Sequence, residues 1–152
     1  YLAAFELGSF DSLAVSDRAG ILSAFTQALA FVNLRWLRKN PGTPSLYGVA
    51  PKYDLKVRPL RFDRWADLVK VYSDRSGDCK DFVAIRLAEE IMLGNFQCAP
   101  FVTHKEIRDP RDGVLYQSFH VQLACGGQID DPAAKLGMPT NVTIDQIRKL
   151  FR

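Results

Sequence analysis

The residues of this sequence that could do chemistry are a cysteine, a histidine and an acid, in that order along the chain. Cys79 follows Gly77 and Asp78 at the start of a stretch with helical periodicity. The unpaired N–H groups and partial positive charge of a helix N-terminus favour a thiolate, which suits a nucleophile. The alternative is a small buried side chain at a helix start, because free cysteines are often buried. Position alone leaves both interpretations of Cys79 open.

His120 lies on a predicted strand, and two neighbouring acids lie on the next one. A two-residue hairpin centred on Gly126 and Gly127 would put Asp131 on the same face as His120. Asp130 would then point to the apolar side of the sheet or to its edge. Diagonal neighbours on one face are close enough for a carboxylate to bond an imidazole. The pattern therefore predicts that Asp131, and not Asp130, contacts His120.

These three residues suit thiol-dependent acyl chemistry. A thiolate would attack a carbonyl, an imidazole would take and return protons, and a carboxylate would orient the imidazole. The backbone N–H of Cys79 is the natural first hydrogen-bond donor to the oxyanion. Trp65 and Tyr72, upstream of the cysteine, are candidates for the second donor.

The same residues carry a family resemblance. Residues 76–81, Ser-Gly-Asp-Cys-Lys-Asp before an amphipathic helix, resemble the G-D-C-x-D signature of the transglutaminase-like superfamily. Residues 119–121, Phe-His-Val, and 129–132, Ile-Asp-Asp-Pro, continue the likeness in the expected order. Residues 131–138 are similar to the end of small transglutaminase-like proteins encoded in bacterial, prophage and phage genomes. The resemblance covers about residues 62–138 and implies a papain-like core.

By this resemblance, Cys79 is the nucleophile, His120 the base and Asp131 the orienting acid. It implies a cysteine protease, amidase or transamidase that acts on an amide of a protein or peptide. Lys80 stands where related sequences often have Glu, which sets the chain apart from calcium-dependent relatives. The superfamily also contains inactive copies. The alternative function is a structural or assembly component, for instance of a phage-like particle, that keeps the fold for contacts.

The periodicity predicts an α+β domain over residues 1–152, with a helix packed on an antiparallel β-meander. Its N-terminal part, 1–61, is a helix from Ser16 to about Asn40 and an irregular proline-rich connection. Residues 62–138 form the catalytic core and 139–152 a C-terminal helix. The expected strands are 96–102, 114–125 and 128–131.

Several side chains receive predicted local roles. Asp63 is expected to cap a short helix, Asp78 the helix of Cys79 with Asp81 as its partner, and Thr143 the last helix. In the Cys79 helix, Arg86, Glu89 and Glu90 are expected to face water.

The composition fits a soluble globular protein. The chain has 152 residues, 47% of them hydrophobic, and a net charge of +3. That charge is too small to predict a nucleic-acid partner, although residues 35–64 are basic with interleaved aromatics. No apolar run reaches the roughly 18 residues of a membrane span. Residues 1–5 lack the basic start of a signal peptide. We expect a cytoplasmic or virion-associated protein rather than a secreted one.

The cysteines and histidines predict neither a disulfide framework nor a metal site. The three cysteines are an odd number without a C-x-x-C pair, so Cys98 and Cys125 are interpreted as core or edge thiols. The two histidines, His104 and His120, have no partner at a zinc-ligand spacing. We expect neither a metal nor a cofactor.

Overall fold

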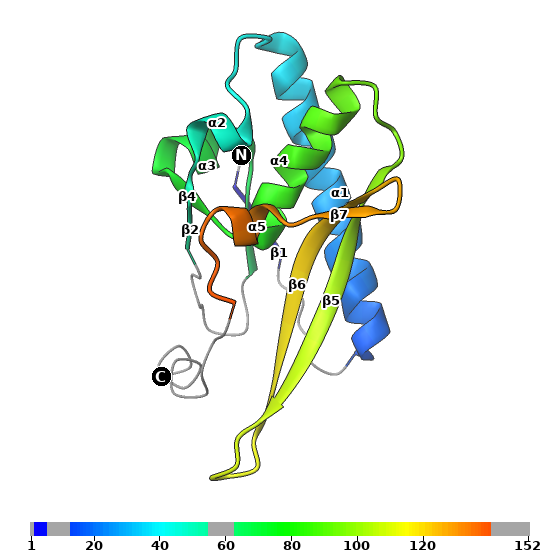
Figure 1. The fold of residues 1–152 in the computed structure, drawn as a ribbon, viewed down its shortest axis with the longest axis vertical. Coiled ribbons are helices and arrows are strands. Elements are labelled where there is room, and N and C mark those ends of the chain that lie inside the picture. Colours follow the sequence, from blue (N-terminus) through cyan, green and yellow to red (C-terminus); the bar gives the residue numbers. More distant parts are fainter. Residues whose placement is uncertain (1, 6–12, 55–62, 141–152) are drawn as a thin grey trace.

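Two helices and a long β-hairpin form the framework of the fold (Figure 1). The structure is a computed structural model that describes residues 2–5, 13–54 and 63–140. Helices α1 (Val15–Lys39) and α4 (Cys79–Met92) pack on each other and on strands β5 (Cys98–Arg108) and β6 (Leu115–Cys125). Strand β7 (Gln128–Asp130) completes an antiparallel sheet of order β5-β6-β7. The predicted α+β class, with a helix on an antiparallel meander, is confirmed.

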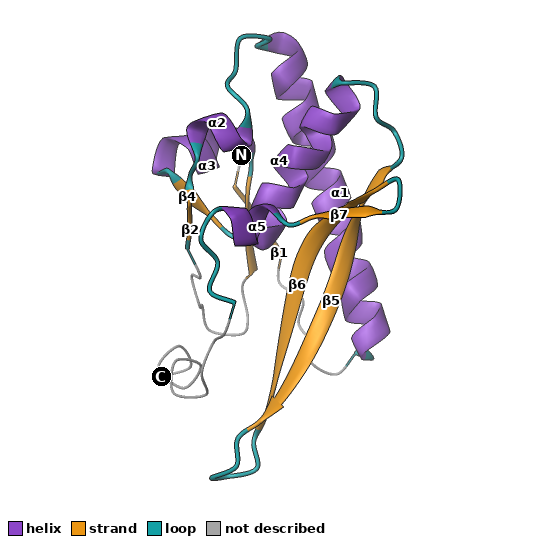
Figure 2. Cartoon of the chain, in the orientation of Figure 1, coloured by secondary structure: helices purple, strands orange, loops and turns teal. Residues whose placement is uncertain are grey.

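Most of the short elements lie on the side of α4 away from the β5–β6 hairpin, and the last short helix contacts both α4 and β6 (Figure 2). Strands β1 and β3 pair antiparallel, and strands β2 and β4 pair in parallel. Their bounds, with those of the short helices, are β1 (Leu2–Phe5), α2 (Leu46–Val49), β2 (Lys52–Tyr53), β3 (Asp63–Ala66), α3 (Leu68–Asp74), β4 (Ser76–Gly77) and α5 (Pro132–Lys135). Within the described ranges, none of the helices combines the length and apolar character needed to cross a membrane.

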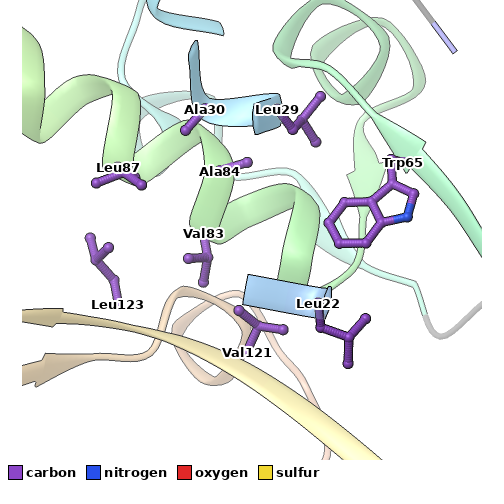
Figure 3. Packing of buried hydrophobic residues seen from close by; sticks show 9 residues of the cluster. All are labelled: Leu22, Leu29, Ala30, Trp65, Val83, Ala84, Leu87, Val121 and Leu123. Carbon is purple, nitrogen blue, oxygen red and sulfur yellow. The ribbon is translucent and has the colours of Figure 1, made fainter. Parts of the chain in front are cut away.

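Helix α4 is the centre of the core. Between Lys80 and Ala88, Arg86 is the one residue that is not buried. On one side α4 packs against α1 and β6, in the cluster drawn in Figure 3: Leu22, Leu29, Ala30, Trp65, Val83, Ala84, Leu87, Val121 and Leu123. On the other side it packs against the short elements through a second cluster: Leu34, Leu37, Leu46, Leu68, Val71, Phe82, Ile85, Ala88 and Ala133. Apolar packing from both sides thus fixes the helix that carries Cys79.

The hairpin between β6 and β7 has the predicted register. Leu123 pairs with Asp130, and the turn residues Gly126 and Gly127 have φ angles of +54° and +84°. Two consecutive positive φ angles are what a two-residue type I′ turn requires, and glycine adopts them without strain. The turn therefore places Asp131 immediately beyond the pairing, on the face predicted from the sequence.

The helix predicted after Asp63 begins later than expected. Asp63 lies in β3, which pairs with β1. Helix α3 starts at Leu68 and is capped by Asp67, whose carboxylate accepts a hydrogen bond of 2.9 Å from the N–H of Lys70. Pairing with a strand some sixty residues away overrides the local capping signal, and Asp67 supplies the same chemistry four residues later. The helix expected after Thr143 lies outside the described residues.

The interpretation of Cys98 and Cys125 as separate thiols is wrong. They form a disulfide, with their Cα atoms 4.2 Å apart. The two residues are directly opposed in the β5–β6 ladder, 27 positions apart in sequence. Their pairing follows from the length of that hairpin, which the sequence pattern did not fix. Cys79 is the free cysteine.

We predict that Gly77→Ala lowers the free energy of unfolding by about 1–3 kcal/mol. A Cβ at Gly77 would lie 2.7 Å from Cε1 of the buried Phe82 and 3.3 Å from Cγ2 of Val71, so these side chains would have to move. Gly20→Ala is the matched control, because a Cβ there meets no atom within 4 Å on α1, and we expect it to stabilise by about 0.5–1 kcal/mol. Urea unfolding measures both. Equal stabilities for wild type and Gly77→Ala would contradict the close packing before Cys79.

Candidate active site

Cys79 is the first residue of α4, at a helix start held by two reciprocal hydrogen bonds. The carboxylate of Asp78 accepts from the N–H of Asp81 at 3.3 Å, and the carboxylate of Asp81 accepts from the N–H of Asp78 at 3.4 Å. This is the capping box predicted from the sequence. No group in the described part of the chain accepts a hydrogen bond from the N–H of Cys79. The helix start therefore presents a donor beside the sulfur.

Asp81 also attaches the start of α4 to the neighbouring strand. Its second carboxylate oxygen accepts from the N–H of Ala66, at the end of β3, at 2.9 Å. Burial raises the pKa of Asp81, and the neighbouring carboxylate of Asp78 raises it further. Lys80 counters both: its ammonium pairs with Asp78 and lies 5.3 Å from the ring centre of Trp65. Charge and hydrogen bonds thus fix the first turn of α4 in place.

His120 and Asp131 are joined directly. The Nε2 atom of His120 lies 2.8 Å from Oδ2 of Asp131, as predicted from the hairpin register. The same oxygen accepts from the side-chain amide of Gln122 at 2.9 Å. The other oxygen, Oδ1, caps α5 by accepting from the N–H of Ala134 at 3.0 Å. Both carboxylate oxygens are therefore occupied, which fixes the carboxylate against the imidazole.

Asp131 is ionised at neutral pH. Burial acts to raise its pKa, but the bonds from Ala134, His120 and Gln122 outweigh it and hold the pKa below the usual range. An ionised carboxylate only accepts, so the Nε2 atom of a neutral His120 must carry the proton. The Nδ1 atom of His120 is then left with a lone pair, as a general base requires.

The sulfur of Cys79 lies against β6 next to His120. The backbone N–H of Val121 acts on the sulfur as a hydrogen-bond donor and lowers its pKa. Within the described residues, no hydrogen bond yet joins the sulfur to the imidazole of His120. The structure thus places Cys79 beside the strand that carries His120, while the direct bond to the base is not made in it.

The thiol of Cys79 is protonated at rest, which differs from the expected thiolate. Burial raises its pKa to about 12, the Asp78 and Asp81 carboxylates add to the rise, and Lys80 and the Val121 N–H act against it. A helix N-terminus favours the thiolate by only about half a charge. Desolvation together with two nearby acids is the larger effect. A nucleophilic role for Cys79 would therefore require a base that takes the proton of the thiol.

Asp130, next in sequence to Asp131, belongs to a different network. Its carboxylate accepts from the hydroxyl of Tyr47 at 2.8 Å and pairs with Lys135 at 2.6 Å and Arg86 at 3.4 Å. Arg86 in turn pairs with the acids expected to face water, Glu89 and Glu90. That expectation is wrong, because α2, β7 and α5 cover this side of α4 with their own polar groups. Asp130 holds the end of β7 to α4.

Of the two upstream side chains considered as oxyanion donors, the structure shows Tyr72 engaged elsewhere and Trp65 packed in the core. Trp65 is 3% exposed and packs in the α1–α4–β6 cluster, and the hydroxyl of Tyr72 donates to the carbonyl of Pro44 at 3.1 Å. Tyr53, which the sequence reasoning missed, lies within electrostatic range of Cys79 and Asp131. An open hollow of about 510 Å³ also borders Tyr53 but includes no residue of the triad.

Over the described ranges, no group of three or more His, Cys, Asp or Glu side chains is arranged to hold a metal ion. Comparison of the chain with protein-family models, with curated proteins and with solved structures found no match.

We predict that Asp131→Asn lowers the free energy of unfolding by about 1–3 kcal/mol at neutral pH, because it removes a charged hydrogen-bond acceptor. The pKa of Asp131 is lower in the folded protein than its ordinary value of 3.8. The ionised group therefore stabilises the fold above that value, and this stability is lost as the pH falls through the folded-state pKa.

The difference between wild type and Asp131→Asn should consequently shrink as the pH is lowered from about 5 to 2, measured by urea unfolding. Asp17→Asn, at an exposed position on α1, is the control and should not reproduce this convergence. A difference that stays constant over the acid range would show that the charge of Asp131 does not stabilise the fold.

Proposed function

We propose that this chain is a thiol-dependent acyl-transfer enzyme that acts on an amide of a protein or peptide. Cys79 is the nucleophile, His120 transfers the proton and Asp131 orients His120. The proposed fold is a papain-like, transglutaminase-like core. This assignment is supported by an antiparallel sheet that carries His120, with Asp131 directly after its last strand, packed on a helix that starts with Cys79.

The observation that carries the proposal is the hydrogen bond between His120 and Asp131. A histidine on a strand is common, but this one is held by a carboxylate that two further donors, Gln122 and Ala134, fix in orientation. The backbone N–H of Val121 donates a hydrogen bond to the sulfur of Cys79. The proposed nucleophile therefore contacts β6 at the residue that follows the proposed base.

The chemistry has two stages. In the first, Nδ1 of His120 takes the proton of the Cys79 thiol as the sulfur forms a bond to the carbonyl carbon, and the carbonyl electrons move to oxygen. The tetrahedral intermediate collapses, the C–N bond breaks, and the amine leaves with the proton from His120. In the second, water or another amine attacks the thioester and the thiol is released. Water makes the enzyme a protease or amidase, and an amine makes it a transamidase.

Because the resting thiol is protonated, His120 must act during attack rather than before it. This resembles the way a serine hydroxyl is activated more than a stable thiolate–imidazolium pair. The ionised Asp131 favours the transfer, since it stabilises the imidazolium that forms when His120 takes the proton.

We predict that wild-type protein, incubated with a library of glutaminyl and peptidyl substrates, forms an acyl-thioester on Cys79. Intact mass spectrometry after acid quench detects the adduct, and an added primary amine separates transfer from hydrolysis by its product. Cys79→Ala should form no adduct. Asp131→Ala should form it about 10²–10⁴-fold more slowly, because His120 loses its orienting group.

The matched control for the adjacent acid is Asp130→Asn, which alters the Tyr47–Arg86 network and leaves the oxygens that bind His120. We expect it to form the adduct at close to the wild-type rate. Equal slowing by Asp130→Asn and Asp131→Ala would show that the acids act through general stability, and would contradict the assigned role of Asp131.

We also predict that alkylation of Cys79 by iodoacetamide accelerates about tenfold per pH unit from pH 6 to 9 without a plateau, because only the small thiolate fraction reacts. The raised pKa of about 12 is the reason. Since Cys98 and Cys125 are in a disulfide, the label reports on Cys79 alone. A plateau below pH 8 would show a thiolate already formed at rest.

The second candidate function is a non-catalytic structural or assembly component, such as a part of a phage-like particle. The observation in its favour is the burial that raises the pKa of Cys79, since inert cysteines are typically buried in this way. The two functions differ in their need for the sulfur. A Cys79→Ala protein that forms every assembly of the wild type, together with a wild type that is never acylated, would establish the structural role.

A further inference from the structure

The proposed acyl transfer creates a negative charge on the substrate oxygen, and one donor for it is in place. The N–H of Cys79 is unpaired at the start of α4, but a single donor leaves the oxyanion poorly stabilised. The inference rests on the proposed function and concerns the second hydrogen-bond donor to this oxygen.

Tyr53 is held next to Cys79 by its backbone. In the parallel pairing of β2 with β4, Tyr53 is the partner of Gly77, two residues before the cysteine. The N–H of Asp54 donates to the carbonyl of Gly77 at 2.9 Å. The N–H of Tyr53 donates to the carbonyl of Leu136 at 3.1 Å, just after the helix that Asp131 caps. Tyr53 thus bridges the segments that carry the nucleophile and the acid.

The ring of Tyr53 is also fixed. It packs edge-on against the ring of Phe82, with the centroids 6.4 Å apart, and Phe82 is a fully buried residue in the first turns of α4. Aromatic pairs of this geometry stabilise a defined ring orientation. Because the ring is already held, the Tyr53 hydroxyl would lose little conformational freedom when it binds a substrate.

The hydroxyl of Tyr53 lies within electrostatic range of Cys79 and Asp131 and is free to donate a hydrogen bond. Burial, the Cys79 sulfur, Asp78 and Asp131 act to raise its pKa and Lys80 acts to lower it, in agreement with the placement of Tyr53 by its pairing with Gly77 and its packing on Phe82. Unlike the hydroxyls of Tyr47 and Tyr72, which donate to Asp130 and Pro44, it has no hydrogen-bond partner among the described residues. A half-buried phenol that is kept protonated and unpaired beside a nucleophile is suited to donate to a substrate.

We infer that Tyr53 Oη–H is the second hydrogen-bond donor to the oxyanion that forms when Cys79 attacks a carbonyl. As the C–S bond forms, the electron pair of the carbonyl moves to its oxygen, which then accepts from Tyr53 and from the N–H of Cys79. No proton leaves Tyr53 at any step. When the intermediate collapses, the electrons return to the carbonyl and the phenol is free again.

Two reactions of the same sulfur test this role. Acetylation of Cys79 by p-nitrophenyl acetate passes through an oxyanion, whereas alkylation by iodoacetamide displaces iodide from a saturated carbon and forms none. In Tyr53→Phe we expect acetylation to slow by about 10²-fold, the typical loss of one oxyanion donor. Alkylation should keep its wild-type rate. Tyr72→Phe, which removes a hydroxyl bonded to Pro44, is the control and should change neither rate.

The outcomes are distinct. If Tyr53→Phe slows both reactions equally, the hydroxyl only positions the thiol and the inference is overturned. Thermal unfolding of the variant and of the wild type gives an assay temperature at which both are folded, so that neither rate reports on unfolded chain. If acetylation is unchanged, the inference is wrong while the proposed function stands. If the wild type is alkylated but never acetylated, both are wrong.

Discussion

Reciprocal hydrogen bonds between Asp78 and Asp81 hold the first turn of α4, and the geometry of the candidate site depends on this turn. Asp81 extends the constraint to β3 through the N–H of Ala66. Beneath it, Phe82 and Val83 are fully buried, in opposite clusters. Any displacement of the turn would therefore break the hydrogen bonds of Asp78 and Asp81 and also the apolar packing of Phe82 and Val83. The position of the sulfur at Cys79 is determined by both.

Strand β6 fixes the position of His120, because it is constrained along both edges. The Cys98–Cys125 disulfide joins it to β5, and the glycine turn that follows joins it to β7. Asp130 then ties the end of β7 to α4 through Arg86. Asp131 is held against His120 by its own bonds from Gln122 and Ala134, so this contact does not depend on Asp130. Disulfides persist in oxidising surroundings, so this support of β6 depends on the redox state of the protein's environment.

The parts of the site that sequence analysis predicted are those set by local geometry. The capping box is specified within four residues, and the choice of Asp131 over Asp130 follows from the parity of a two-glycine turn. The wrong or missing parts are non-local. The partner of Cys98 depends on the length of a hairpin, and the contact of Tyr53 with Gly77 depends on a parallel pairing between short strands. A single sequence shows neither.

The two ionisable groups that the proposed mechanism couples have pKa values shifted in opposite directions, although burial acts to raise both. Burial raises the pKa of Cys79, whose surroundings include two carboxylates, whereas Asp131 overcomes the same effect with three hydrogen bonds. Transfer of a proton from the sulfur to His120 therefore leaves a thiolate that its surroundings destabilise. It also creates an imidazolium that the ionised Asp131 stabilises. Attack on a carbonyl removes the thiolate as it forms, because the charge passes to the substrate oxygen. In the proposed mechanism, such a site keeps the Cys79 thiol protonated until a substrate binds, and its fixed hydrogen-bond donors stabilise the oxyanion.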